Sequence, residues 1–352
     1  MKKLYELEQT LQKNIDDLVV PGFVYGVITA SDNYCGSVGY SQLVPTKNKI
    51  SEQYLYDIAS LTKVISTVTI ICRLVEKGKI SFNDSVKKYL HNFKYDDITI
   101  YNLLVHNSGL PADLGGKKEI VSKDEIIRQI YLQDKEYDTS SDVLYSDLGY
   151  MLLGLIIEKV CNKSLDEVAQ EEVFIPLEMY NTSFNPIDKD KCVPTEFDSK
   201  RGLVKGIVHD EKACSMNGVS GHAGVFSNIS DLMNYTSMVL NDGVYKDKRY
   251  LKKETIDLWF KNLVYEEKQN RTRSLCWITN NNDLVVKNRN NIISFNGFTG
   301  PSISIDRENN IGIILLTNRI HPTRDNKKIS LERPIIYENI YNELNKNKIH
   351  KI

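Results

Sequence analysis

A serine and a lysine three residues apart, Ser60 and Lys63, begin an apolar segment that reads "SLTKVISTVTIICRLVEKG". Residues i and i+3 share one face of a helix, so the Ser60 hydroxyl and the Lys63 amine can come within hydrogen-bond distance. The positive partial charge of a helix N-terminus favours a serine alkoxide, and burial lowers the pKa of a lysine by up to ~3 to 5 units. A neutral Lys63 would then act as a base and activate Ser60 as a nucleophile.

A second Ser-x-x-Lys pair shows that this spacing alone proves little. Ser85 and Lys88 lie in the polar segment "FNDSVKKYLHNF", which is typical of a solvated helix start. The first pair has a similar alternative explanation, in which Ser60 is an ordinary helix cap and Lys63 extends its charged end toward solvent. The strand-like "YLYDIA" before Ser60 and the apolar helix after it set the first pair apart.

The elements that would position these residues change in kind along the chain. An amphipathic helix is expected at residues 3–17, followed by strands in "FVYGVITA" and "NYCGSVGY". Helical patterns with polar caps and closing glycines run from residue 61 to about residue 240. Strands return in "SLCWITN", "NNIISFNGFTGPSISID" and "IGIILLTNR", before a last helix at about residues 333–346.

This order predicts an α/β fold of the α+β type. One antiparallel sheet, flanked by helices, is formed by both chain ends and carries an inserted, mainly helical domain. We assign residues 1–60 and 240–352 to the sheet domain and residues 61–239 to the helical domain, with the active site in the cleft between them.

The charge balance excludes partners that bind through a broad basic surface. The 352 residues include 45 Lys and Arg and 46 Asp and Glu, so we expect a small-molecule or peptide substrate and no nucleic acid. No apolar stretch approaches the ~20 residues of a membrane span, and the first residues lack the apolar run of a signal peptide. We expect a cytoplasmic protein, or an extracytoplasmic one if the chain was trimmed. The sequence does not report the oligomeric state.

The six cysteines are widely scattered. They form no Cys-x-x-Cys pair, and no histidine stands at metal-ligand spacing, so neither a disulfide nor a zinc site is expected.

Several longer segments together resemble one family of hydrolases. These segments are "ASLTK", "ITIYNLLVHNSGL", "VLYSDLGYMLLGLIIEKV", "FIPLEMYNTSF" and "GVSGHAGVFSNISDL". They resemble the serine β-lactamase and penicillin-binding-protein superfamily, nearest to class C β-lactamases and related esterases and D-amino-acid peptidases. The resemblance covers residues 18–345 and implies that Ser60 is the nucleophile and Lys63 its base.

The family's second motif, Tyr-x-Asn, resembles Tyr145-Ser146-Asp147, in which Asp147 replaces the asparagine. The resemblance implies that the Tyr145 phenol passes a proton between Ser60 and the leaving group, whereas a buried core tyrosine is the alternative. Asp147 stands at a substrate-binding position of the family. Its charge would raise the pKa values of Lys63 and Tyr145, or its oxygen would accept a hydrogen bond from Lys63 as the amide does.

The family's third motif, Lys-Thr-Gly or His-Thr-Gly, matches this chain in two registers. If Phe298-Thr299-Gly300 were the motif, the next residue would be Pro301, which has no N–H to donate to an oxyanion. Aligning Phe295-Asn296-Gly297 instead leaves that donor to Phe298.

We choose the second register and expect an oxyanion hole made by the N–H groups of Ser60 and Phe298. Asn296 and Gly297 then stand at substrate-binding positions. Phe295 replaces the family's cation, which weakens the expected grip on a substrate carboxylate. We expect neither His222 nor His106 to be catalytic. His106 is expected at a helix end, where a charged imidazole would complement the helix dipole.

Together these residues predict a serine hydrolase that works through an acyl-enzyme on Ser60, with no metal or organic cofactor. Its substrate would be a β-lactam, a D-amino-acid peptide or an ester. The alternative is a catalytically impaired, ligand-binding homologue of the same fold, in which Phe295 marks the decay of the third motif.

Overall fold

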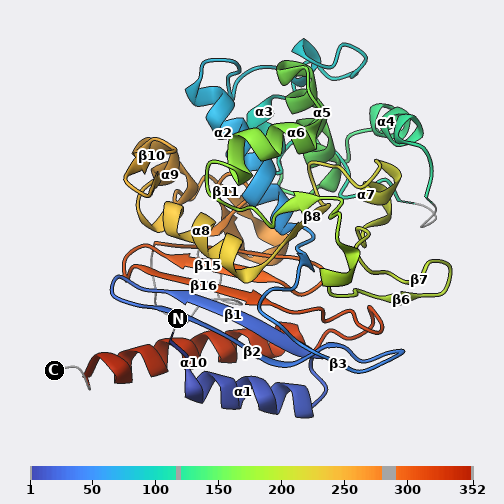
Figure 1. Cartoon of the computed structure of the whole chain (residues 1–352). Coiled ribbons are helices and arrows are strands. Elements are labelled where there is room, and N and C mark those ends of the chain that lie inside the picture. Colours follow the sequence, from blue (N-terminus) through green and yellow to red (C-terminus); the bar gives the residue numbers. More distant parts are fainter. Residues whose placement is uncertain (1, 116–119, 280–290, 350–352) are drawn as a thin grey trace.

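The computed structural model describes residues 2–115, 120–279 and 291–349. Its largest element is an antiparallel sheet of nine strands in the order β11-β12-β13-β14-β15-β16-β1-β2-β3 (Figure 1). The strands are β1 (Gly22–Ile28), β2 (Asn33–Gln42), β3 (Asn48–Lys49), β11 (Val264–Glu266), β12 (Arg271–Arg273), β13 (Ile278–Thr279), β14 (Ile292–Asn296), β15 (Ser302–Asp306) and β16 (Ile311–Leu316). Because β1 pairs with β16, the two chain ends build one sheet, and the expected fold class is confirmed.

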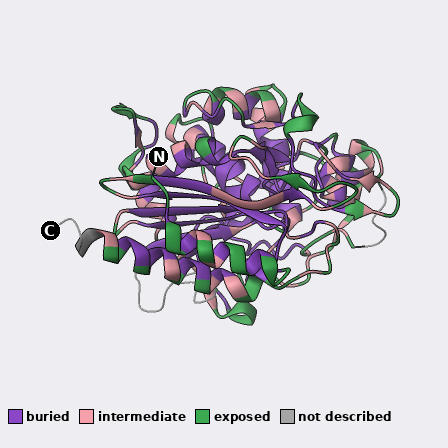
Figure 2. Cartoon of the chain, turned by 60° about the horizontal axis from the view of Figure 1, so that its bottom comes forward, coloured by how far each residue is buried: buried purple, intermediate pink, exposed green. Residues whose placement is uncertain are grey.

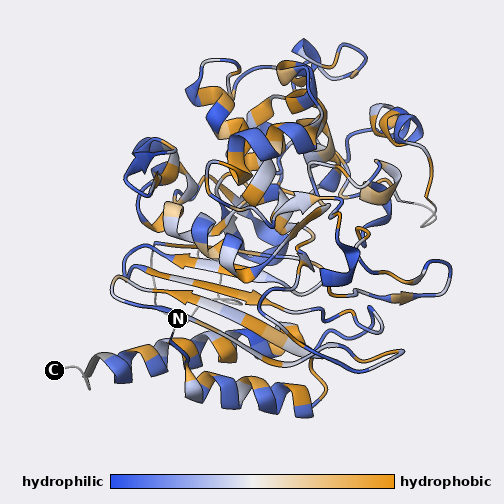
Figure 3. Cartoon of the chain, in the orientation of Figure 1, coloured by the Kyte–Doolittle hydropathy of each residue, from blue (hydrophilic) through white to orange (hydrophobic). Residues whose placement is uncertain are grey.

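The sheet is covered on both faces. Helices α1 (Tyr5–Asp16) and α10 (Ile329–Ile349) pack against one face, and α8 (Ile229–Leu240) packs against the other (Figure 1). Side chains of β1 alternate accordingly: Phe23, Tyr25 and Val27 join the cluster under α1 and α10, whereas Val24 and Ile28 join the cluster on the opposite face. Strands β1 and β16 are buried on both faces, which explains why their sequences are almost continuously apolar (Figures 2 and 3). These apolar segments are the ones from which the sequence predicted strands.

The middle of the chain is mainly helical. Its longest helix, α5 (Asp147–Cys161), buries an uninterrupted run from Leu148 to Ile157, because it is surrounded by other helices. The remaining helices are α2 (Thr69–Glu76), α3 (Ile100–Leu104), α4 (Lys123–Leu132), α6 (Leu165–Ala169), α7 (Glu211–Ser215) and α9 (Lys253–Trp259). The division of domains at residues 60/61 and 239/240 stays a prediction.

A small sheet of three strands carries the chain into the Ser60 region. Its strand order is β4-β8-β5, with β4 (Tyr56–Asp57), β5 (Ser183–Phe184) and β8 (Val225–Ser227). The remaining strands form two separate hairpins. One pairs β6 (Phe197–Asp198) with β7 (Gly202–Leu203), and the other pairs β9 (Val244–Tyr245) with β10 (Lys248–Arg249). All six cysteines are free. Within the described ranges, no helix has both the length and the apolar character needed to cross a bilayer.

Candidate active site

Ser60 lies at a sharp turn between β4 and a helix. Its neighbour Ala59 has a left-handed backbone, with φ of +46°, and the N–H of Lys63 donates to the Ser60 carbonyl oxygen at 3.1 Å, which opens the helix. The following turns, Lys63–Val68, are wound as a π-helix before α2 continues the same rod. The hydroxyl therefore stands at a helix N-terminus, as the apolar pattern predicted.

Lys63 is fully buried and makes three contacts. Its Nζ lies 3.0 Å from Ser60 Oγ, 2.9 Å from the carbonyl oxygen of His222 and 2.7 Å from Asp147 Oδ1. The first two contacts are hydrogen bonds that Lys63 donates, whereas the contact with Asp147 is an ion pair in which Oδ1 is not placed to accept a hydrogen bond. The Ser60 hydroxyl thus accepts a hydrogen bond from Lys63 in the free protein.

The charge on Lys63 differs from the sequence expectation. Burial by itself lowers the pKa of Lys63, but the adjacent Asp147 carboxylate and Tyr145 more than offset burial and raise that pKa above its ordinary value. Of the two expectations for Lys63, neutralisation by burial is wrong, whereas the alternative, in which the charge of Asp147 raises the pKa of Lys63, agrees with the structure. Replacing the family's asparagine by Asp147 supplies a full negative charge at 2.7 Å.

Asp147→Asn tests this control of the Lys63 proton. The amide keeps the shape but removes the charge that raises the Lys63 pKa, so burial then lowers that pKa. Lys63 is expected to act as the base for Ser60, and only its neutral amine can accept a proton, so activity should rise with pH through the Lys63 pKa. We expect the rising limb of kcat/KM against pH to move at least ~1 unit toward lower pH in Asp147→Asn. A limb that stays in place, or moves to higher pH, would contradict this assignment.

Tyr145 lies beside the pair. The Lys63 Nζ is 4.9 Å from the centroid of its ring, and burial, partly opposed by Lys63, raises the pKa of Tyr145 to about 12. The phenol is therefore protonated at neutral pH and can donate. The His106 ring packs against the Tyr145 ring in a tilted arrangement, with the centroids 4.7 Å apart, and the His106 Nδ1 accepts the Ser146 N–H.

The expected charge on His106 is also corrected. This histidine is buried, and desolvation together with Arg273 and Lys63 holds its pKa well below the ordinary value, so the ring is neutral. His222 is likewise buried, but its ring is held by side chains: Nε2 lies 2.9 Å from Asp210 and Nδ1 lies 2.8 Å from Ser220 Oγ. Only its carbonyl oxygen contacts Lys63.

The third-motif segment turns beside Ser60. Asn296 ends β14, Gly297 donates to the Pro301 carbonyl oxygen at 2.8 Å, and a Cβ on Gly297 would lie 2.6 Å from the Ile58 carbonyl oxygen. Only glycine permits this approach to the nucleophile turn. Neither the N–H of Ser60 nor that of Phe298 has an acceptor among the described residues. The two donors assigned to the oxyanion hole are therefore free to bind one.

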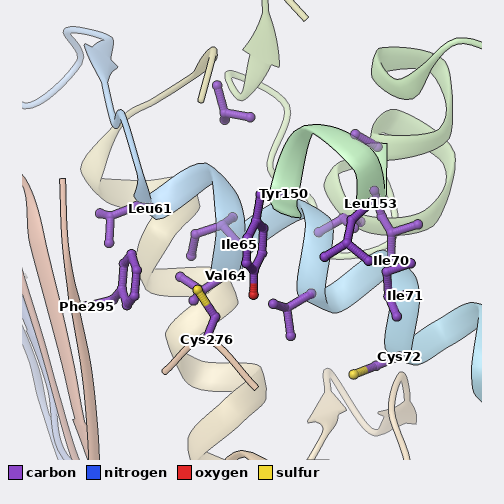
Figure 4. Packing of buried hydrophobic residues seen from close by; sticks show 14 of the residues in the cluster. Leu61, Val64, Ile65, Ile70, Ile71, Cys72, Tyr150, Leu153, Cys276 and Phe295 are labelled. Carbon is purple, nitrogen blue, oxygen red and sulfur yellow. The ribbon is translucent and has the colours of Figure 1, made fainter. Parts of the chain in front are cut away.

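Phe295 fills a core position. Its side chain is 2% exposed and packs near Leu61 and Cys276 (Figure 4), with its ring 6.4 Å from that of Tyr145 and 6.5 Å from that of Trp277. It offers no charge to a substrate. Next to it, the Asn296 side chain has a buried Oδ1 without a hydrogen-bond partner in the described part of the chain. This oxygen can accept a hydrogen bond from a substrate amide.

Ser60, Tyr145, Asp147 and the segment 295–298 line a cleft of about 690 Å³. Most charged groups in it are already paired with each other, for example Lys212 with Asp113 and Arg324 with Glu211. Arg319 and Arg333 also line the cleft, and in the described ranges no carboxylate lies within 4 Å of either guanidinium. Burial lowers the pKa of Arg333 to about 10, and a charged Arg319 nearby contributes to that shift. Arg333 is buried and Arg319 is half-buried, so an anionic ligand would offset part of the desolvation cost of both charges.

Three ligating side chains also lie close together in the described structure. One atom each of Asp147, Asp210 and His222 lies within 4.8 Å of the others. All three are engaged, Asp147 with Lys63 and Asp210 with His222, and the Lys63 ammonium would repel a divalent cation. The group therefore fits an ion-pair network better than a metal site.

The second Ser-x-x-Lys copy lies on the surface. Ser85 caps a short 3₁₀ turn, and Lys88 is 57% exposed and pairs with Asp84 at 2.8 Å. The spacing is the same, but neither residue lines the cleft described above.

Comparison with known proteins identifies the family. The family model described as Beta-lactamase matches residues 7–333. The chain belongs to the Beta-lactamase family. It is 31% identical to the N-acetylmuramyl-L-alanine amidase of Bacillus subtilis (strain 168), over 96% of this chain and 85% of that protein. It is 32% identical to an Escherichia coli O157:H7 protein provisionally named a D-alanyl-D-alanine carboxypeptidase, over 85% of this chain and 76% of that protein.

Solved structures agree on the fold. A class C β-lactamase superposes with a TM-score of 0.77, covering 96% of this chain and 95% of that chain at 18% identity. The Beta-lactamase family and the named relatives consist of hydrolases of the serine type, and this chain is one of them.

Three residues of the site region were not identified from the sequence: Arg319, Arg333 and Asp57. Asp57 lies directly behind Ser60. Arg319 follows the end of β16, and Arg333 lies in α10 after a long connection, so no local pattern links them to Ser60. Asp57 carried a weak signal, because it is an acidic residue inside the strand-like "YLYDIA". A charge at a predicted buried position indicates a structural or functional partner.

Proposed function

We propose that this protein cleaves an amide or ester carbonyl through an acyl-enzyme on Ser60. The observation that carries the proposal is the 3.0 Å contact between Ser60 Oγ and the buried Lys63 Nζ, in a cleft beside two unoccupied backbone donors. The alternative, a binding protein without catalysis, rested on Phe295, but Phe295 packs into the core while Ser60, Lys63 and Tyr145 retain their arrangement.

The roles of the site residues in this proposal follow from their positions. Lys63 first releases its proton to solvent, and its neutral amine then takes the proton of Ser60 while Ser60 Oγ attacks the substrate carbonyl carbon. The Lys63 ammonium later returns a proton to Tyr145, after Tyr145 has protonated the leaving group. The N–H groups of Ser60 and Phe298 bind the oxyanion. Tyr145 donates a proton to the leaving group, and water then hydrolyses the acyl-serine. No step requires a metal or an organic cofactor.

The substrate that fits best is an acylated amino acid or peptide with a free carboxylate. Arg319 and Arg333 supply the positive charge that Phe295 does not, and Asn296 Oδ1 offers an acceptor for an amide N–H. The names of the amidase and carboxypeptidase relatives support amino-acid amides over simple esters. A β-lactam carries the same carboxylate and an amide, so it stays a second candidate substrate. The cytoplasmic location expected from the sequence stays a prediction.

A pair of substrates differing only in charge tests this preference. N-acetyl-D-alanyl-D-alanine should be hydrolysed with a kcat/KM at least ~10-fold above that of its C-terminal amide, since a charge-assisted bond to arginine contributes roughly 1.5–3 kcal/mol. Arg319→Gln and Arg333→Gln should each reduce that ratio, mainly through KM. Arg307→Gln is the matched control, because Arg307 pairs with Asp242 and Asp257 outside the cleft. Equal rates on both compounds in the wild type would contradict the proposal, and a preference for p-nitrophenyl acetate would indicate an esterase.

A further inference from the structure

Asp57 is a buried carboxylate directly behind the nucleophile turn. It lies in β4, is 3% exposed, and forms no ion pair with a Lys, Arg or His side chain of the described residues. Instead it accepts two backbone hydrogen bonds. Oδ1 accepts the N–H of Ala59 at 2.9 Å, and Oδ2 accepts the N–H of His209 at 2.7 Å. A buried charge held by main-chain donors alone fixes the position of those donors.

The first of these bonds fixes the Ser60 side of the oxyanion hole. Ala59 has the left-handed φ of +46°, a backbone conformation that alanine rarely adopts without external support. The Ala59 N–H is tied to Asp57, and the next backbone N–H along the chain is that of Ser60. Asp57 therefore sets the direction in which the Ser60 N–H points.

The backbone of Asp57 fixes the other side. Its carbonyl oxygen accepts the Thr299 hydroxyl at 2.7 Å, and Thr299 directly follows Phe298. The second carboxylate bond reinforces this link, because the ring of His209 stacks on the Phe298 ring at a centroid distance of 5.7 Å. Both N–H donors of the expected oxyanion hole are thus one residue away from a group bonded to Asp57.

From these contacts we propose that Asp57 is a positioning residue of the oxyanion hole. It holds the N–H groups of Ser60 and Phe298 at the separation that a tetrahedral oxyanion requires. The inference rests on the proposed acyl-enzyme function. Asp57 touches neither substrate nor Ser60 Oγ; it acts through Ala59, His209 and Thr299.

Asp57→Asn tests the role with little change of shape. The amide has one oxygen, so one of the two backbone N–H groups must face an NH2 group and move away. Because the oxyanion exists only in the transition state, kcat should fall at least ~10-fold while KM changes less than ~3-fold; complete removal of one donor costs about 10² to 10³-fold. Binding of phenylboronic acid, whose adduct places an oxygen in the hole, should weaken by the same factor as kcat. The measurements are kcat and KM for p-nitrophenyl acetate and the inhibition constant of phenylboronic acid.

Asp231→Asn is the matched control. Asp231 is equally buried, at 3% exposure, and accepts the Asn181 N–H at 2.7 Å and the Thr182 hydroxyl at 2.8 Å, but it does not line the cleft. It should lower the melting temperature as Asp57→Asn does and leave kcat within ~2-fold of the wild type. A similar loss of kcat in both variants, or unchanged kcat in Asp57→Asn, would overturn the proposal.

Thr299→Val keeps the test valid if Asp57→Asn fails to fold. It removes only the hydroxyl bond to the Asp57 carbonyl oxygen. We expect a smaller fall in kcat than in Asp57→Asn, with boronic acid affinity reduced by that same smaller factor, and a change in KM without a change in kcat would contradict the proposal. Wild-type protein that forms no boronic acid adduct and hydrolyses none of the compounds would show instead that the proposed function is wrong.

Discussion

Ser60→Ala should lower kcat/KM by at least ~10⁴-fold and abolish covalent labelling. The alanine cannot form an acyl-enzyme, and the oxyanion donors and the binding cleft alone retain only a small part of the rate enhancement in serine hydrolases. The measurement is intact-protein mass spectrometry after incubation with a fluorophosphonate and, separately, with a penicillin. The wild type should gain the mass of one phosphonyl group, and Ser60→Ala should gain none.

Ser85→Ala is the control for this experiment. The second Ser-x-x-Lys copy has the same spacing, but Ser85 is outside the cleft and donates to the Asp96 carbonyl oxygen. The Ser85→Ala variant should gain the same fluorophosphonate adduct as the wild type and should have the same activity. Labelling of Ser60→Ala would assign the nucleophile to another residue. An unlabelled wild type would favour the binding-protein alternative.

Lys63→Met should reduce kcat by roughly 10³-fold, because it removes the base while filling nearly the same volume. Loss of stability could imitate this result, since Asp147 would lose its partner. The Asp147 side chain as a whole is 25% exposed, although the Oδ1 that faces Lys63 is buried, so water would offset only part of the lost contact, and we expect a cost of about 1–3 kcal/mol.

The double variant Lys63→Met/Asp147→Asn separates stability from catalysis. Removing both partners leaves no unpaired charge, so the melting temperature should recover toward that of the wild type. The activity should not recover. Lys88→Met, which breaks only an exposed pair with Asp84, should change neither quantity appreciably. Recovery of activity in the double variant would show that Lys63 is structural and not the base.

Local sequence patterns specified much of the site. The i, i+3 spacing brought Ser60 and Lys63 together because both lie on the first turn of one helix, and that geometry needs no other part of the chain. Proline at 301 selected the register of the third motif, because a residue without an N–H cannot serve as a donor. The alternation of strands and helices predicted a sheet formed by both chain ends, which the pairing of β1 with β16 confirms.

The tertiary structure decided the charges. Whether Lys63 is neutral or protonated depends on burial, which lowers its pKa, and on Asp147, 84 positions away, and Tyr145, which together outweigh burial. Likewise, two cleft cations without a carboxylate partner in the described ranges, Arg319 and Arg333, come from beyond β16 and from α10. The proposed support of the oxyanion hole includes a hydrogen bond between Asp57 and Thr299, which are 242 residues apart. Residue type and helical spacing are local properties, so the sequence determines which groups can react. A pKa and the position of a hydrogen-bond donor depend on every charge and dipole within several ångströms, and only the folded chain brings those together.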